Sequence, residues 1–378
     1  MNFIKSESII LMNKKKVLWL VPEKKGGIQS YSQTLLSKWK SDDFKIDSLF
    51  FSDKESSWRI HLEQNSYDLI HIQHEYGLFG KKIPFLYRFS SFLKRLKTLH
   101  HQPVIATLHT VIPEGFRYPI KKEKPLEIPF RIMGNMFHSS LYRYWNAEWK
   151  NLDGAIVHSK LQMNPMIKSG LKSVKVIPHF VPEAKNLYSQ NSKFKILIFG
   201  YFSFEKGQDL VIRAIDQLKN LPIDWVFAGG VRTSSDQAYF DSCKKLISDL
   251  NLESQVKITG FVPESEIDSH YQNTSLVITP FRETFGSGSI VQALSRAMPV
   301  LASDHPINLE LDERTPGCLT FFKRNDLDSL VVQIQKLFEN TELRNQLSKK
   351  AFEYAQSCQI ETVLKEHQSY YREFITLI

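Results

Sequence analysis

The chain of 378 residues is longer than one hydrophobic core usually serves, so we expect two domains of ordinary size. Hydrophobic residues make up 42% of the sequence, which excludes a disordered chain, and no apolar run approaches the ~20 residues that span a bilayer. Three distant cysteines with no metal-ligand or disulfide spacing favour a reducing, cytoplasmic setting. The net charge of +9 suits an anionic ligand or surface, but no nucleic-acid-binding module is recognisable.

Continuous apolar runs alternate with amphipathic segments along the chain. Residues 1–13 precede the first clear strand and are expected to be a flexible leader, without the pattern of a cleavable signal peptide. The first half has expected strands at 17–21, 69–72, 104–108, 155–157 and 174–177. A polar linker at 182–193 separates them from strands at 194–200, 225–230, 256–260, 276–279 and 299–302.

Unalternated apolar strands spaced by helices are typical of parallel sheets that helices cover on both faces. The sequence therefore predicts an α/β protein with two Rossmann-like, doubly wound domains, residues 14–185 and 190–360, and a last helix at 361–378. Ligands of such sheets bind at the carboxyl ends of the strands, so the two domains are expected to face a central cleft.

A glycine pair follows the first strand directly. Gly26 and Gly27 open the next helix, where glycine lets the backbone approach a phosphate and the helix N-terminus offers free N–H groups. The segment lacks both the G-x-G-x-x-G pattern and the P-loop pattern, and a glycine pair can also be a simple turn. Phosphate contact and a structural turn therefore both remain open here.

A richer loop begins at Glu283, between the strand ending at 279 and a helix expected from about residue 290. Ser287, Gly288 and Ser289 could present N–H and hydroxyl donors to a pyrophosphate, and Glu283 could accept hydrogen bonds from sugar hydroxyls. The competing interpretation is a helix N-cap with a flexible turn. The combination of one acidic residue with glycines and serines at a strand end favours a ligand loop.

Charged and histidine side chains follow other strands. Lys206 lies just after the first strand of the second half, where it could neutralise a diphosphate, although such a lysine is often only solvated surface. In the first half, His109 ends one strand, and His74 and Glu75 follow another. Two strand-end histidines in one domain favour a site for hydroxyl recognition over isolated structural histidines.

Taken together, these positions resemble the retaining glycosyltransferases with the GT-B fold, specifically the family-4, or glycosyl transferases group 1, type. The resemblance extends from about Lys15 to the C-terminus. It rests on an ordered set of motifs: Gly-Gly-Ile at 26–28, His109, Lys206-Gly207, the turn at 260–263, Glu283-x-Phe285-Gly286, and the segment 297–303.

The resemblance implies a hexosyltransferase that moves mannose or glucose from a GDP- or UDP-linked sugar to a saccharide or glycolipid acceptor. It implies retention of configuration without a covalent nucleophile, a metal or another cofactor. His109 would contact the sugar at the reacting centre, Lys206 would stabilise the leaving diphosphate, and Glu283 would hold the sugar hydroxyls. The last helix would cross back onto the first domain.

Other residues acquire donor-binding roles from the same resemblance. Gly26 and Gly27 would approach the diphosphate or the sugar, Val262 would lie near the base, and His74 and Glu75 would lie on the acceptor or sugar side. The remaining positions would complete the donor cradle: Tyr201, Phe285, Gly286, Ser287, Gly288, Ser289 and Gln292.

Two positions depart from the family pattern. Tyr201 stands where the family commonly has arginine, so phosphate charge is expected to rest on Lys206, helix N-termini, and either Arg232 or Arg282. The family places a second glutamate eight residues after the first, but here position 291 is valine and Gln292 follows. An amide can still bond ribose hydroxyls.

The segment 81–97 is basic and amphipathic. It could lie on the inner face of an anionic membrane and approach a lipid-linked acceptor. The favoured alternative is a helix that packs its apolar face on the first sheet and leaves its lysines in solvent.

Three other functions remain open. A sugar-nucleotide epimerase of the same fold would act without an acceptor, and an inactive scaffold subunit would bind nucleotide without turning it over. A nucleic-acid-binding protein would fit the charge alone and would bind in a salt-dependent way.

Overall fold

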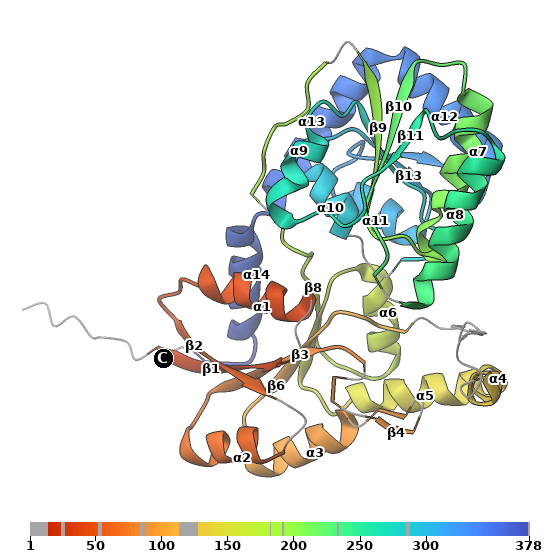
Figure 1. Ribbon diagram of the computed structural model, residues 1–378. Helices are drawn as coiled ribbons and strands as arrows, with labels where there is room; N and C mark the ends of the chain where they lie inside the picture. The colour runs from red at the N-terminus through yellow and green to blue at the C-terminus, as the bar shows by residue number, and fades with distance from the viewer. Residues whose placement is uncertain are drawn as a thin grey trace, which may run out of the picture. The chain divides into compact units, whose positions relative to one another are not determined.

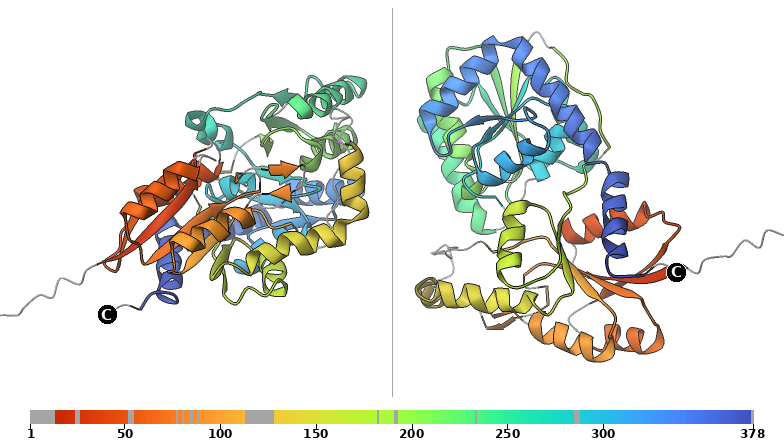
Figure 2. Two further views of the ribbon diagram at one scale, coloured as in Figure 1. Left: turned by 90° about the horizontal axis from the view of Figure 1, so that it is seen from below. Right: turned by 180° about the vertical axis from the view of Figure 1, so that it is seen from behind.

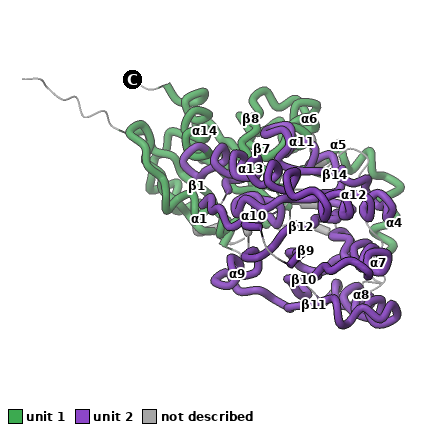
Figure 3. Tube along the Cα trace, turned by 90° about the horizontal axis from the view of Figure 1, so that it is seen from above, with its two compact units in different colours: residues 1–178, 363–378 green, residues 179–362 purple. Residues whose placement is uncertain are grey.

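The computed structural model describes residues 14–23, 27–51, 55–76, 78–79, 81–83, 86–87, 89–112, 128–181, 183–190, 193–232, 234–284 and 288–376 (Figure 1). The chain forms two compact units (Figure 3). Unit 1 comprises Met1–Pro178 and Val363–Ile378, and unit 2 comprises His179–Thr362. The division follows Pro178, a few residues before the linker expected at 182–193. The expected leader, residues 1–13, lies outside the described residues.

Unit 1 is built on a six-stranded parallel sheet in the order β2-β1-β3-β6-β7-β8. Helices cover both faces, with α2 and α3 on one side and α1 and α14 on the other (Figures 1 and 2). The strands are β1 (Lys15–Pro22), β2 (Phe44–Phe51), β3 (Leu69–His74), β6 (Val104–Leu108), β7 (Gly154–Val157) and β8 (Val174–Val176). The helices are α1 (Gly27–Ser37), α2 (Glu55–Gln64), α3 (Phe89–Leu99), α4 (Ile128–Met136), α5 (His138–Trp149), α6 (Lys160–Lys168) and α14 (Ile360–Arg372).

Unit 2 contains a second six-stranded parallel sheet, in the order β11-β10-β9-β12-β13-β14. Alternate residues of its strands enter two cores, one under α7, α8 and α12 and the other under α9, α10 and α13. The strands are β9 (Phe194–Phe199), β10 (Ile223–Ala228), β11 (Val256–Ile258), β12 (Leu276–Thr279), β13 (Val300–Ser303) and β14 (Thr320–Phe322). The helices are α7 (Gln208–Leu218), α8 (Gln237–Asp249), α9 (Ile267–Tyr271), α10 (Gly288–Leu294), α11 (Pro306–Arg314), α12 (Leu327–Glu339) and α13 (Thr341–Ser357), with 3-10 turns η2 (Phe204–Lys206), η3 (Ser234–Asp236) and η4 (Glu264–Glu266).

These two sheets confirm the predicted α/β fold of two doubly wound, Rossmann-like units. The structure adds the edge strands β2 and β14, which the sequence analysis did not identify, because edge strands are short or only partly buried. It also corrects the segment 81–97. Residues Lys81–Ile83 (β4) and Leu86–Tyr87 (β5) pair as an antiparallel ribbon, and α3 begins only at Phe89, after Pro84 interrupts any helical pattern.

Helix α14 is tied to the sheet of unit 1 through a buried polar network. The Tyr371 hydroxyl accepts a hydrogen bond from Trp19 Nε1 at 2.9 Å and lies 2.6 Å from His71 Nδ1. His71 Nε2 lies 2.7 Å from Thr107 Oγ1. Two tautomers of a neutral His71 fit this network: one accepts from Tyr371 at Nδ1 and donates to Thr107 from Nε2, and the other donates to Tyr371 from Nδ1 and accepts from Thr107 at Nε2. Burial lowers the pKa of His71 well below its usual value.

We expect the free energy of unfolding to fall as pH is lowered from 7 to 5.5. Burial lowers the pKa of His74 to about 3 and that of His367 to about 4, so these rings stay neutral in the fold while the unfolded chain takes up protons below pH 6.5. Each such histidine should cost about 1 kcal/mol over this range. Denaturant unfolding at both pH values measures this loss of unfolding free energy. The variant His367→Gln should lose about 1 kcal/mol less than the wild type, because it lacks one of the buried histidines. An equal pH dependence in that variant would contradict the assignment.

Candidate functional site

The strand order of unit 2 defines where a ligand would bind. Counted within the unit, it is 3-2-1-4-5-6, so the connections from the adjacent strands β9 and β12 leave toward opposite sides. A crevice at the carboxyl ends of the strands forms where the order reverses, and ligands of open α/β sheets bind there. The loops after β9 and β12 carry Lys206 and Glu283, the two predicted catalytic residues of this unit.

Glycines allow the loops at this edge to pack against one another. A Cβ on Gly229, after β10, would lie 1.9 Å from the carbonyl oxygen of Gly200, which follows β9 with a φ of +132°. A Cβ on Gly207 would lie 2.2 Å from the carbonyl oxygen of Pro280, after β12. Neither contact leaves room for a larger residue, so Gly229 after β10 and Gly207 after Lys206 are required by packing.

The backbone joins the β9 and β12 loops. The N–H groups of Arg282 and Glu283 both donate to the Glu205 carbonyl oxygen, at 2.8 and 3.2 Å. Lys206 Nζ lies 3.7 Å from the centroid of the Phe281 ring, in a cation–π contact. The structure therefore brings together Lys206 and the segment that leads into Glu283.

Lys206 is half-buried, and its pKa is lowered to about 8. Burial is the largest cause, the carboxylate of Glu205 opposes it, and the positive charge of Arg232 adds to the lowering. A lysine with this pKa keeps its proton at neutral pH, although burial disfavours its positive charge and the nearby carboxylate of Glu205 offsets this only in part. Such an ammonium is suited to an anion that arrives with the ligand.

Arg232 brings a second cation to this edge from the loop after β10. It is exposed, its guanidinium lies 6.0 Å from the centroid of the Tyr201 ring, and its charge acts on Lys206. Tyr201 occupies the position where the family pattern has arginine. The aromatic ring thus lies beside an arginine supplied by the neighbouring strand.

Arg282, the other arginine considered from the sequence, already has an ion partner. Its guanidinium binds the Asp209 carboxylate in a two-pronged pair, at 2.7 and 2.8 Å, and Tyr239 donates to the same carboxylate at 2.5 Å. Burial opposes ionisation of Asp209, but hydrogen bonds from Arg282 and Tyr239 outweigh it and hold the pKa below its usual value. Arg282 therefore fixes the loop to α7, and Arg232 is the better candidate for an anion.

Glu283 is exposed and lies beside two cationic or polar groups. Its carboxylate oxygens are 3.6 Å from His305 Nε2 and 3.6 Å from Arg324 Nη1. Arg324 also donates to the Arg282 carbonyl oxygen at 3.2 Å, which holds it at the end of β12. Burial lowers the pKa of His305 against the opposing effect of Glu283, so a neutral ring faces the carboxylate.

The other predicted donor-binding residues of unit 2 are only partly accounted for. Val262 is half-buried after β11, and Ser289 lies in the first turn of α10, with its Oγ 3.9 Å from where a Cβ on Gly200 would stand. Gln292 accepts a hydrogen bond from Arg296 on its side-chain oxygen, which engages one of the two acceptor sites of that oxygen. Gly288 begins α10, whereas Phe285, Gly286 and Ser287 lie outside the described residues.

At the carboxyl edge of the sheet in unit 1, His109 is held from two sides. Its Nε2 lies 3.0 Å from Gln73 Oε1, and its Nδ1 lies 3.3 Å from His158 Nε2. His158 Nδ1 is 2.9 Å from the Ile177 carbonyl, which can only accept, so the Nε2 of a neutral His158 accepts a hydrogen bond from His109 Nδ1. A neutral His109 then accepts at Nε2, which requires the Gln73 amide to present its NH2 group there. Gly27 is the first residue of α1, and Gly26 lies outside the described residues.

The structure corrects the prediction for His74 and constrains Glu75. His74 is 1% exposed and lies among aromatic rings, with ring centroids 4.5 Å from Phe89 and 5.0 Å from Trp149, so it cannot contact an acceptor. Glu75 accepts from the Thr110 hydroxyl at 2.6 Å, and burial raises the pKa of its carboxyl group despite that bond. Glu75 therefore joins two strand-end loops.

Sequence reasoning missed three side chains that adjoin the predicted residues. His158 follows β7 just as His109 follows β6, so the same strand-end signal was present. Arg324 follows β14, a strand that the sequence did not reveal, and His305 caps the N-terminus of α11. These two residues approach Glu283 from neighbouring strands of the sheet.

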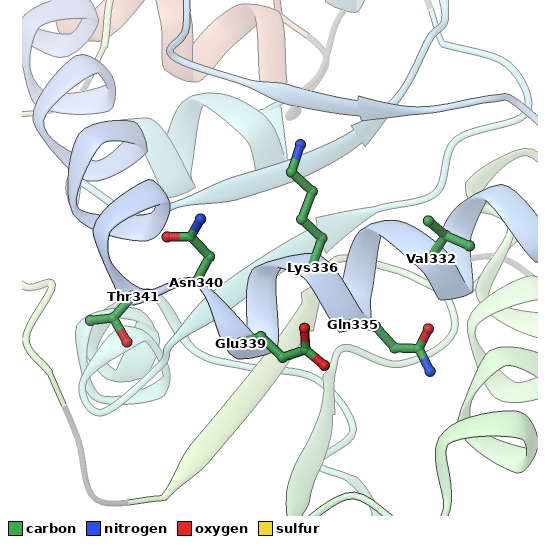
Figure 4. Close-up of a pocket in the computed structure, with 6 residues that line it drawn as sticks. All are labelled: Val332, Gln335, Lys336, Glu339, Asn340 and Thr341. Carbon is green, nitrogen blue, oxygen red and sulfur yellow. The ribbon is translucent and has the colours of Figure 1, made fainter.

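Other features considered for ligands or membranes do not form a site. A shallow depression of about 620 Å³ runs along α12 and the start of α13, but its lining side chains point in different directions (Figure 4). On α3, the apolar residues Phe89, Phe92, Leu93 and Leu96 are buried, which confirms packing on the sheet and leaves no apolar face there for a membrane. Across the described residues, every helix is too short or too polar to cross a bilayer.

Comparison with known proteins gives a family match in unit 2. Residues 183–354 match the family described as Glycosyl transferases group 1. D-inositol 3-phosphate glycosyltransferase 1 from Catenulispora acidiphila is 33% identical over 117 residues, 29% of this chain and 28% of that protein. The match therefore spans less than a third of the relative.

Solved structures resemble nearly the whole chain. Sucrose-phosphate synthase from Thermosynechococcus elongatus has a TM-score of 0.70 at 15% identity, covering 95% of this chain and 99% of its own. HepE from Anabaena, solved in complex with UDP, has a TM-score of 0.70 at 16% identity, covering 95% and 100%. A glycosyltransferase from Rickettsia africae has a TM-score of 0.68 at 14% identity, covering 96% and 99%. At these identities the likeness shows a shared GT-B fold.

Proposed function

Because residues 183–354 match the glycosyl transferases group 1 family and the chain has the GT-B fold, we propose that the protein transfers a hexosyl group from a nucleotide diphosphate sugar to a carbohydrate acceptor. The observation that carries this proposal is the presence of two cations at the switch point of unit 2: Lys206, over the Phe281 ring that follows β12, and Arg232, beside the Tyr201 ring that follows β9. Two cations at one edge of the sheet suit an anion with more than one charge, and a diphosphate supplies it.

In this proposal, Lys206 and Arg232 bind the diphosphate and stabilise the negative charge that develops as it leaves. Arg232 replaces the arginine that Tyr201 displaces from the family pattern, and the Tyr201 ring supports its guanidinium. Side-chain cations thus take the role that a divalent metal has in other transferases, and no cofactor is required. Such fixed charges stabilise a transition state without reorganisation during the reaction.

Further groups are proposed to hold the sugar. Glu283, which lies beside His305 and Arg324, is proposed to accept hydrogen bonds from sugar hydroxyls. His109 is proposed to contact the sugar at the reacting centre, with its ring orientation set by Gln73 and His158. In a retaining reaction without a covalent intermediate, the acceptor hydroxyl attacks on the face from which the diphosphate departs. The departing phosphate oxygen then receives the acceptor proton.

The proposal also names the sugar donor and the acceptor. Glucose or mannose, carried by UDP or GDP, is the proposed donor, and a saccharide or glycolipid is the proposed acceptor. HepE, which shares the fold, has been solved in complex with UDP-glucose. This likeness supports testing UDP-linked sugars first.

We expect UDP or GDP to raise the melting temperature of the full chain through mass action, and Arg232→Ala to weaken that nucleotide's affinity about tenfold, by loss of one charged hydrogen bond. Titration of the melting temperature with each nucleotide gives the affinity. Arg213→Ala, an exposed arginine on α7, serves as the matched control. Equal binding by wild type and Arg232→Ala would remove Arg232 from the site but leave the proposed function standing.

Turnover separates the transferase from its alternatives. A transferase releases nucleotide diphosphate only as sugar reaches an acceptor, whereas an epimerase converts the nucleotide sugar with no acceptor present. An inactive scaffold binds the nucleotide and releases none. If neither UDP nor GDP stabilises the folded protein, the assignment of the site in unit 2 is wrong.

A further inference from the structure

An exposed apolar surface lies on α4 and α5 in unit 1. Figures 1 and 2 show α5 running outward along the unit, with α4 at its outer end. Met136 is 72% exposed and Phe137, between the two helices, is 58% exposed. We call the whole set the α4–α5 surface: Phe130, Ile132, Met133, Met136, Phe137 and Tyr144.

This surface does not belong to the folded core. Within the described chain, the cores under the two sheets take in Trp149 at the inner end of α5 but none of the six side chains of the α4–α5 surface. Six large apolar groups in solvent on two adjoining short helices exceed the scattered exposure that a soluble protein normally shows. Their exposure is unfavourable unless something apolar covers them.

Between residues 128 and 150, the exposed charges that the structure describes have one sign. Arg143 and Lys150, on and just after α5, are exposed. The one carboxylate between residues 128 and 150, Glu148, is only 5% exposed. The charge presented to a partner by this part of the described chain is therefore positive.

We propose that the α4–α5 surface binds an anionic lipid bilayer. Phenylalanine, isoleucine and methionine would enter the boundary between head groups and acyl chains, while arginine and lysine would contact the lipid phosphates. Pairing with a second copy of the chain is less favourable, because a twofold interface places the same patch against itself and so brings these cations together. This contact surface differs from the segment 81–97, whose apolar side chains on α3 are buried.

Sedimentation of the full chain with vesicles tests the proposal. One set of vesicles consists of phosphatidylcholine alone, and the other also contains phosphatidylglycerol as a third of the lipid. We expect binding to the anionic vesicles, and the double variant Met136→Glu/Phe137→Glu should reduce the partition coefficient at least about tenfold through lost apolar burial and added negative charge. Ile167→Glu is the matched control, because Ile167 on α6 is 53% exposed in the same unit.

Further outcomes bear on the proposal. Arg143→Glu should weaken binding without changing the melting temperature or its response to nucleotide, which shows that the variant is folded. Unchanged vesicle binding by the Met136→Glu/Phe137→Glu variant would overturn the proposal, since the attraction would then be general to the basic chain. Light scattering would also overturn the proposal if it showed that the wild type is a dimer and the Met136→Glu/Phe137→Glu variant a monomer. The α4–α5 surface would then be a site of self-association. Neither of these results depends on whether the protein transfers a sugar.

Discussion

Replacement of Lys206 by alanine should lower kcat about 100- to 1,000-fold, the usual cost of removing one preorganised group that stabilises developing negative charge. Lys206 is the half-buried cation at the β9–β12 switch point, and its ammonium is held over the Phe281 ring. Arg232 would remain in the variant and would retain part of the nucleotide affinity. The loss should therefore appear more in kcat than in the affinity for the free nucleotide. Lys219→Ala, at the exposed end of α7, should leave both quantities unchanged.

The lowered pKa of Lys206 adds a pH dependence to this result. With a pKa of about 8, the ammonium of the free protein loses its proton as pH rises from 7.5 to 9, so affinity for a nucleotide diphosphate should fall over that range. Lys206→Arg stays charged and should show little of this fall. A wild-type affinity that is flat from pH 7.5 to 9, or an unimpaired Lys206→Ala variant, would contradict the role assigned to Lys206.

The fold was predictable because its inner strands are buried on both faces. β1 and β6 are nearly continuous apolar runs, and such runs can be recognised without knowledge of their neighbours. β2 and β14 lie at the edges, where only part of each strand is buried, and they give a weaker pattern. Residues 81–88 share apolar and basic composition with α3, so composition alone could not separate a strand ribbon from a helix.

The site was predictable only as far as the strand ends carried a chemical signal. Lys206 and Glu283 follow adjacent strands, and a parallel sheet brings such positions to one edge. Burial depends on packing from distant segments, so the sequence could not show that His74 is enclosed by Phe79, Phe89 and Trp149. The choice between Arg232 and Arg282 likewise depended on which of them meets an acidic partner.

Arg282→Met should reduce the free energy of unfolding of unit 2 by about 3 kcal/mol, because it leaves the Asp209 carboxylate partly buried without its ion partner. In the intact protein, Asp209 is bound by two guanidinium nitrogens and by the Tyr239 hydroxyl. Arg282 also donates to the Phe204 carbonyl oxygen at 2.9 Å, which ties the β12 loop to the turn before Lys206. Denaturant unfolding of the full chain, followed by tryptophan fluorescence, gives the change.

The double variant Arg282→Met/Asp209→Asn tests the cause of this loss. Removing both charges should recover a large part of the stability, since the neutral amide can still bond Tyr239 and no unpaired charge is buried. Arg232→Ala should behave in the opposite way, with little change in unfolding and a clear loss of nucleotide affinity, because its guanidinium is exposed. If Arg282→Met kept full stability and lost nucleotide binding, the roles of the two arginines would be reversed. Stability and affinity thus separate the arginine that shapes the loop from the arginine that meets the ligand.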